Sequence, residues 1–197
     1  MRLGLTGSIG MGKSTTAALF AEAGMPVWDA DAAVHRLYAA GGRGVEPIRA
    51  AFPEVVIDGA VSRDALRAHL RDDPGALQHL EAIVHPLLAQ DRADFMAQCE
   101  RDAAPVAVFD IPLLLETGLD AEMDATLVVS APAAVQRARV LERPGMSADQ
   151  FDTLLARQMP DAEKRARADH VIETHSIDQT RRDVLDLIRT LREGRDA

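Results

Sequence analysis

A chain of 197 residues with a formal net charge of −9 at pH 7 is long enough for one α/β domain with a full hydrophobic core. Hydrophobic residues make up 47% of the chain and aromatic residues only 4%, so we expect an aliphatic interior. The acidic balance argues against nucleic acid as a general partner. No apolar run approaches the roughly 20 residues that cross a bilayer, so we expect no membrane association. No obligate protein partner is evident.

Cysteine usage indicates a reducing environment. The single cysteine, Cys99, excludes an intramolecular disulfide, and neither it nor the six histidines show the spacing of zinc ligands. A first strand that begins directly at the N-terminus leaves no room for a signal peptide. We therefore expect a cytoplasmic protein.

The first elements in the chain predict a phosphate-binding loop. An apolar run at 2–6 suits a buried strand, an Ala-rich run at 15–23 suits a packed helix, and residues 7–14 between them read Gly-Ser-Ile-Gly-Met-Gly-Lys-Ser. These eight residues match the pattern G-x-x-x-x-G-K-[ST] throughout. Such a loop needs glycines that adopt positive φ and let backbone N–H groups surround an anion. The helix that follows adds the positive end of its dipole.

The loop predicts a nucleoside triphosphate site with Mg²⁺. In this pattern Lys13 reaches the β- and γ-phosphates, and the Ser14 hydroxyl is placed to bind the metal. The order of strand, loop and helix argues against a glycine-rich turn with a stray lysine. The residues that we expect to contact the nucleotide are Ser8, Ile9, Gly10, Met11, Gly12, Lys13, Ser14 and Thr15.

The rest of the chain alternates strands and helices. Further strands are expected at 26–29, 105–110, 125–130 and 170–173, with a helix at 31–40 after the second strand. Residues 44–101 are predicted to be helical with breaks at Pro53, Gly59, Pro74 and Pro86, so that a helix runs from His85 to about Cys99. A capping box at 147–150 begins a later helix.

Five short, apolar strands of this kind predict an α/β fold: a P-loop NTPase-like, five-stranded parallel sheet with helices on both faces. Right-handed crossovers place the ligand crevice at the carboxyl ends of the strands, with the loop and Asp29, Asp31 and Asp110. We expect one P-loop kinase domain over 1–197. Within it, 44–101 is predicted to be a helical insertion that binds the acceptor, and 139–167 a lid.

The chain resembles the dephospho-coenzyme A kinase family over about residues 3–172. The segments that carry this likeness, in order, are the loop, Asp29-Ala30-Asp31, His85-Pro86, 110–116, the spacing Gln136…Arg139…Arg143, 157–160, Lys164-Arg165 and 168–172. The resemblance implies transfer of the γ-phosphoryl group of ATP to the ribose 3′-hydroxyl of dephospho-coenzyme A, the last step of coenzyme A synthesis.

The sequence departs from the family pattern in several places. Ser8 stands where a second glycine is usual, and His35 where arginine is also common. Thr174 and Ser176 replace an asparagine and a glycine that often follow the last strand. The two changes after the strand leave the adenine contacts unassigned.

Three residues are candidates on the acceptor side. Asp31 is expected to accept the proton of the attacking hydroxyl, as the resemblance also implies, or to cap the helix that follows it. Asp29 either orients the water shell of the metal or ends its strand. His85 either contacts the acceptor or caps its own helix.

Four residues are candidates on the donor side. Lys13 neutralises phosphate charge, and Asp110 holds the metal through water from a Walker-B-like position after four apolar strand residues. Arg139 and Arg143 are four apart on a predicted helix and would close over the triphosphate from one helix face. The alternative for Arg143 is an ordinary ion pair involving Glu142.

Other functions are distinguished by specific residues. Another P-loop small-molecule kinase, of nucleoside or shikimate type, would share the loop and lid but not the Asp-Ala-Asp and His-Pro segments. A GTP-binding switch needs an Asn-Lys-x-Asp motif, which this sequence lacks. A nucleotide-binding module without catalysis would lack the acid beside the loop, where this chain has Asp31.

Overall fold

The computed structural model describes residues 1–73 and 75–193, and the chain forms two compact units. The first unit consists of Met1–Trp28 together with Cys99–Ala197, and the second of Asp29–Gln98. The second unit begins at the end of the second strand, so the helix after that strand belongs to it and not to the sheet-bearing unit.

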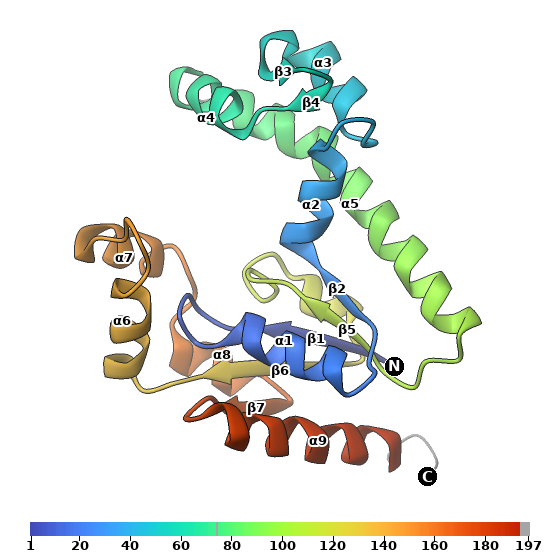
Figure 1. Cartoon of the computed structure of the whole chain (residues 1–197), viewed down its shortest axis with the longest axis vertical. Coiled ribbons are helices and arrows are strands. Elements are labelled where there is room, and N and C mark those ends of the chain that lie inside the picture. The colour runs from blue at the N-terminus through green and yellow to red at the C-terminus, as the bar shows by residue number, and fades with distance from the viewer. Residues whose placement is uncertain (74, 194–197) are drawn as a thin grey trace. The chain divides into compact units, whose positions relative to one another are not determined.

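A five-stranded sheet organises the first unit (Figure 1). Its strand order is β2 (Val27–Asp29), β5 (Ala107–Asp110), β1 (Arg2–Thr6), β6 (Ala125–Ser130) and β7 (His170–Glu173). The registers of β1 with β5, β1 with β6, and β6 with β7 are parallel. All residues of β5 and β6 are buried, as expected for central strands of a sheet covered on both faces. The predicted fold class is confirmed.

One face of the sheet is covered by α1 (Lys13–Glu22) and α9 (Ile177–Glu193), which contact each other. Alternate residues of the central strands, such as Leu3, Leu5 and Leu127, share one hydrophobic cluster with Phe20 of α1 and Leu187 of α9. The period-2 alternation of strand side chains therefore directs these residues to the helices.

The opposite face of the sheet is covered by the segment that follows β5. A Cβ on Gly4 of β1 would lie 2.7 Å from the Leu114 side chain and 2.8 Å from that of Met123, so a larger residue at this position would force these two side chains to move. The segment includes the short helix η2 (Leu119–Glu122), and α8 (Asp161–Arg167) contacts β6.

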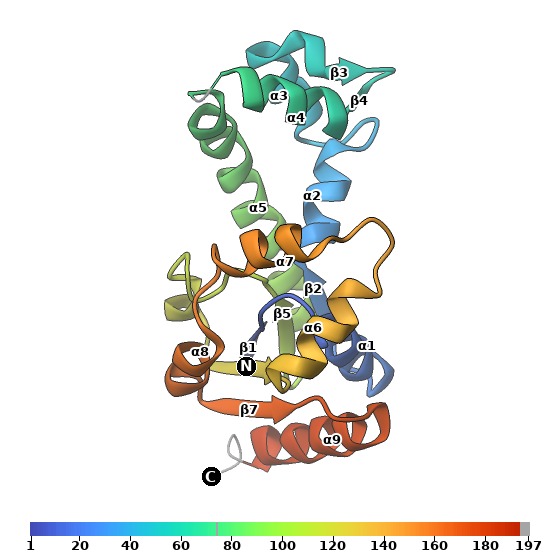
Figure 2. The ribbon, with the colours of Figure 1, turned by 90° about the vertical axis from the view of Figure 1, so that its left-hand side faces the viewer.

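Two further helices, α6 (Ala133–Leu141) and α7 (Ala148–Leu155), follow β6 (Figure 2). The predicted capping box is confirmed: Ser147 and Gln150 exchange side-chain and backbone hydrogen bonds at the start of α7. Phe151 of α7 is buried, and the Arg137 guanidinium lies 5.6 Å from the centre of its ring.

The described residues of the second unit form five helical segments and a hairpin. Their bounds are α2 (Ala30–Tyr38), α3 (Val45–Ala51), η1 (Pro53–Val55), β3 (Val56–Ile57), β4 (Ala60–Val61), α4 (Arg63–Asp72) and α5 (Ala76–Arg101). Its core gathers around Ile48, Phe52 and Val55. The β3–β4 hairpin turns at Asp58 and Gly59, both with positive φ, which is the Asp-Gly turn that favours a tight hairpin.

The long helix α5 corrects one sequence prediction. It spans 26 residues and contains Pro86 in its interior, so the predicted break there is wrong. An interior proline costs about 3 kcal/mol in a helix because it removes one N–H donor; here Leu80 and Val84 on one side of it are buried in the core, and Leu87 and Leu88 on the other pack against that core. The predicted break at Pro74 lies outside the described residues.

A membrane-spanning helix requires both length and an apolar sequence. Over residues 1–73 and 75–193, no helix is both long and apolar enough to cross a membrane.

Candidate active site

The loop after β1 has the backbone that its glycines predict. Gly10 and Gly12 have φ of 80° and 91°, and Gly12 is the N-cap of α1. A Cβ on Gly7 would lie 2.7 Å from the Val129 carbonyl oxygen, so the loop also passes very close to β6. The first N–H groups of α1 have no acceptor within the helix. The sequence therefore forms an anion-binding turn at the start of a helix.

Lys13 and Asp110 form an ion pair beside this loop. Lys13 Nζ lies 2.5 Å from Asp110 Oδ1, because Asp110 ends β5 and β5 lies next to β1. The Asp110 side chain is only 2% exposed, whereas that of Lys13 is 15% exposed. The ammonium is thus held at the mouth of the loop by a buried carboxylate.

The residues present suit Mg²⁺. Ser14, exposed in the first turn of α1, offers a hydroxyl, and Asp110 offers a carboxylate. Mg²⁺ sites use one or two carboxylates with substrate phosphates and water instead of a full protein cage. The described part of the chain contains no group of three or more His, Cys, Asp or Glu side chains able to hold a metal.

A cavity of about 420 Å³ adjoins the loop. Its walls come from the loop, from the end of α6 and the turn beyond it, and from the segment that follows β7. The lining residues are Gly10, Gly12, Thr15, Arg139, Arg143, Thr174, His175, Ser176, Ile177 and Thr180. A cavity that combines phosphate-binding glycines with two arginines suits a polyanionic ligand.

The two predicted arginines line this cavity, although not for the predicted reason. Arg139 lies on α6, but the helix ends at Leu141, so Arg143 lies in the turn beyond it and the same-face argument is wrong. Among the described residues, neither Glu142 nor Arg143 forms an ion pair, and Arg143 is exposed.

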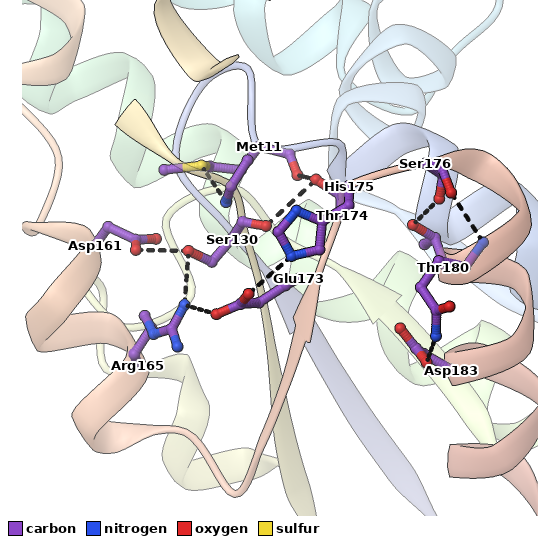
Figure 3. Close-up of polar contacts among 12 residues, drawn as sticks. Met11, Ser130, Asp161, Arg165, Glu173, Thr174, His175, Ser176, Thr180 and Asp183 are labelled. Carbon is purple, nitrogen blue, oxygen red and sulfur yellow. Dashed lines mark hydrogen bonds and ion pairs between the residues drawn. The ribbon is translucent and has the colours of Figure 1, made fainter. Parts of the chain in front are cut away.

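Thr174 is a site residue whose role the sequence did not reveal (Figure 3). Its hydroxyl donates to the Met11 carbonyl of the loop at 2.8 Å and accepts from Arg139 Nη1 at 2.9 Å. Its carbonyl accepts from Arg139 Nη2 at 2.6 Å. Thr174 therefore joins the loop to the arginine. One hint of this role lies in the sequence: Thr174 replaces an asparagine that often follows the last strand in the family.

A chain of polar contacts continues from Thr174 along the carboxyl ends of β6 and β7 (Figure 3). Ser130 Oγ donates to Asp161 Oδ2 at 2.7 Å, and Arg165 pairs with Glu173 at 2.9 Å. The hydrogen bond from Arg165, followed by that from His175, lowers the pKa of the Glu173 carboxyl. These contacts tie the start of α8 to the strand ends beside the loop.

The predicted acceptor-side residues belong to the second unit. Asp29 is the N-cap of α2, since its Oδ1 accepts from the Ala32 N–H at 2.8 Å, so the expectation that Asp31 is the cap is wrong. Asp31 lies exposed in the first turn of α2, with no helix end to satisfy. His85 is exposed in the interior of α5, so it does not cap that helix either.

Comparison with protein families gives a match over nearly the whole chain. The model of the family described as dephospho-CoA kinase matches residues 1–179. The dephospho-CoA kinase of Cereibacter sphaeroides is 59% identical over 196 residues, covering 100% of this chain and 98% of that protein. That of Ruegeria pomeroyi is 55% identical, covering 98% and 96%.

Solved structures give the same picture. TT1252 from Thermus thermophilus is 37% identical with a TM-score of 0.82, covering 96% of each chain. Dephospho-CoA kinase from Campylobacter jejuni has a TM-score of 0.72 at 22% identity, covering 98% of each chain. Shikimate kinase from Bacteroides thetaiotaomicron shares the fold more distantly, with a TM-score of 0.50 at 17% identity and coverage of 97% and 98%.

Proposed function

Because the chain belongs to the dephospho-CoA kinase family, we propose that it transfers the γ-phosphoryl group of ATP to the ribose 3′-hydroxyl of dephospho-coenzyme A. The 3′-oxygen forms a bond to the γ-phosphorus while the bond to the β,γ-bridging oxygen breaks. ADP leaves, coenzyme A is formed, and the hydroxyl proton passes to a carboxylate. The buried single cysteine, Cys99, fits a cytoplasmic enzyme.

The observation that carries this proposal is the meeting of the loop glycines and two arginines around one cavity, with Lys13, which directly follows Gly12 of that loop, paired with Asp110. Phosphoryl transfer requires mainly positioning and the neutralisation of negative charge. Lys13 supplies a point charge for the phosphate oxygens, and Arg139 and Arg143 supply guanidinium groups. The Ser14 hydroxyl, and Asp110 through water, would hold Mg²⁺, which when bound would supply further positive charge to the phosphates.

We assign the acceptor to the second unit. Asp31 accepts the hydroxyl proton, and this assignment is supported by its carboxylate, which has no hydrogen bond or ion pair with the part of the chain that the structure describes, since Asp29 already caps α2. Asp29 and His85 contribute to acceptor binding, with 44–101 as the acceptor-binding insertion. The segment 139–167, which contains α7 and the turn with Arg143, acts as a lid over ATP.

A coupled ADP-release assay tests the proposal. The enzyme is offered ATP and Mg²⁺ with dephospho-coenzyme A, shikimate or adenosine in parallel reactions. We expect turnover with dephospho-coenzyme A alone. Turnover with shikimate or adenosine in its place would move the chain to another class of P-loop small-molecule kinase.

A further inference from the structure

One residue of the phosphate loop, Ile9, is held by two glutamines. The Ile9 N–H donates to Gln158 Oε1 at 2.9 Å, and Gln136 Nε2 donates to the Ile9 carbonyl at 2.8 Å. Gln136 lies on α6 and is 4% exposed, whereas Gln158 lies between α7 and α8. Both backbone polar groups of Ile9 are therefore used by side chains far away in the sequence.

Gln158 is itself held by a buried charge pair. The N–H of the next residue, Met159, donates to Glu116 Oε1 at 2.9 Å. The same oxygen lies 2.7 Å from the ammonium of Lys164, whose side chain is fully buried. Burial acts to raise the pKa of Glu116, but Lys164 and the Met159 N–H outweigh it and lower that pKa. The carboxylate thus stays charged and fixes the backbone next to Gln158.

The loop has reason to need such support. Gly7, Gly10 and Gly12 give it the close approaches and positive φ that a phosphate requires, but glycine also leaves an unliganded chain many other conformations. Anchoring Ile9, between Gly7 and Gly10, removes much of this freedom before the nucleotide arrives. An element that is ordered in advance loses less entropy on binding.

We propose that Gln136 and Gln158 are positioning residues that clamp the backbone of Ile9 and thereby couple the α6–α8 segment to the phosphate loop. Neither side chain is required to touch the nucleotide. The clamp links the order of the loop to the order of the segment that carries Arg139 and Arg143. This inference rests on the proposed function in one respect: the affinity test assumes that the loop binds the adenine nucleotides ATP and ADP.

The first test measures ADP affinity by calorimetry for Gln158→Met, which keeps the side-chain length and removes the acceptor. We expect the affinity to fall by about threefold to tenfold, the range for the loss of one hydrogen bond. Gln136→Met should give a similar loss. Because both glutamines hold the backbone of the same residue, Ile9, the double variant should lose less affinity than the product of the two single effects.

The second test needs no nucleotide. Amide hydrogen exchange of the free protein should be faster at Ile9 in Gln158→Met than in the wild type. The Met11 N–H, which donates to the Ser8 carbonyl at 3.1 Å, serves as an internal reference and should change less.

Thr126→Val provides a matched control away from the loop. The Thr126 hydroxyl donates to Asp169 Oδ2 at 2.8 Å and accepts from the Asp169 N–H at 3.1 Å, so this variant also loses partly buried hydrogen bonds. It should lower the melting temperature and leave both ADP affinity and Ile9 exchange unchanged.

The outcomes separate the clamp from the proposed function. Gln158→Met with wild-type ADP affinity and wild-type exchange at Ile9 refutes the clamp. So does an equal loss of affinity in Thr126→Val, because general destabilisation then explains the effect. A wild-type enzyme that binds ADP but does not phosphorylate dephospho-coenzyme A refutes the proposed acceptor and leaves the clamp intact.

Discussion

The two lysines of this chain occupy opposite kinds of site. Lys13 and Lys164 each pair with one carboxylate, at 2.5 and 2.7 Å. The Lys13 side chain is 15% exposed at the mouth of the phosphate loop, whereas Lys164 is fully buried between the sheet and the segment after β5. Because Lys13 is partly exposed, we expect it to exchange its carboxylate for a phosphate that approaches the loop. Lys164 has no such opening, so its charge serves the structure.

The largest expected effect comes from the exposed pair. Lys13→Ala should lower kcat by several orders of magnitude, because a fixed charge on the transferring phosphate is lost. The melting temperature of Lys13→Ala should fall less than that of Lys164→Met. The double variant Lys13→Ala with Asp110→Asn removes the carboxylate left without its ammonium and should recover stability without recovering activity. A single variant within about tenfold of wild-type kcat, or about 1.4 kcal/mol of barrier, contradicts a catalytic role for the loop.

A second test asks whether Asp31, which does not cap α2, acts as the general base. Asp31→Asn should lower kcat by roughly 10²–10⁴-fold, the usual contribution of general-base catalysis. ATP affinity and melting temperature should remain near wild-type values. Asp29→Asn is the matched control for the cap, because asparagine caps helices about as well as aspartate. Full turnover in Asp31→Asn would move the proton acceptor elsewhere.

Breaking the buried pair should mainly affect stability. Lys164→Met leaves Glu116, whose side chain is 17% exposed, without its cation, and the free energy of unfolding should fall by up to about 3–5 kcal/mol, the range for buried pairs that lose one partner. The kcat of the folded enzyme should change by less than about tenfold. Urea unfolding and steady-state kinetics measure the two quantities. A large loss of kcat with unchanged stability in Lys164→Met would contradict the assignment of Lys164 to structure and of Lys13 to catalysis.

The smallest effect concerns pH. The pKa of Glu116 is lower in the folded protein than in the unfolded chain, so the stability that it contributes is present above its unfolded pKa. That contribution is lost as the pH falls through the folded pKa. Urea unfolding of the wild type and Glu116→Gln at neutral and acidic pH should show a shallower acid dependence in the variant. Equal slopes would mean that Glu116 titrates alike in both states.

Local sequence signals predicted most of the fold. The strands, the loop and the capping box at Ser147 were found because each depends on residues close together in the chain. The interior proline of α5 was misjudged because packing of Leu80 and Val84 outweighs a local cost. The β3–β4 hairpin was missed, although Asp58-Gly59 is a known hairpin signal.

The site was predicted less completely, because its supports join distant segments. Gln158 and Ile9 are 149 positions apart, and Thr174 and Met11 are 163 apart, so no periodicity links them. The resemblance drew attention to the segments with Gln136 and Gln158 but gave neither a role. Asp29 was not expected to be the cap of α2 because Asp31 has the same chemistry two residues later.

The scarcity of lysine has a practical consequence for chemical labelling. Arginine does not react with acylating reagents at neutral pH, since its guanidinium stays protonated. Of the two lysine side chains, Lys164 is sealed from solvent and Lys13 is not. In the folded enzyme, a lysine-directed acyl reagent has therefore one side-chain target, which is the residue expected to hold the transferred phosphate. The yield of acylated Lys13, read by mass spectrometry of the peptide that contains it, would report how much of the loop is occupied by nucleotide.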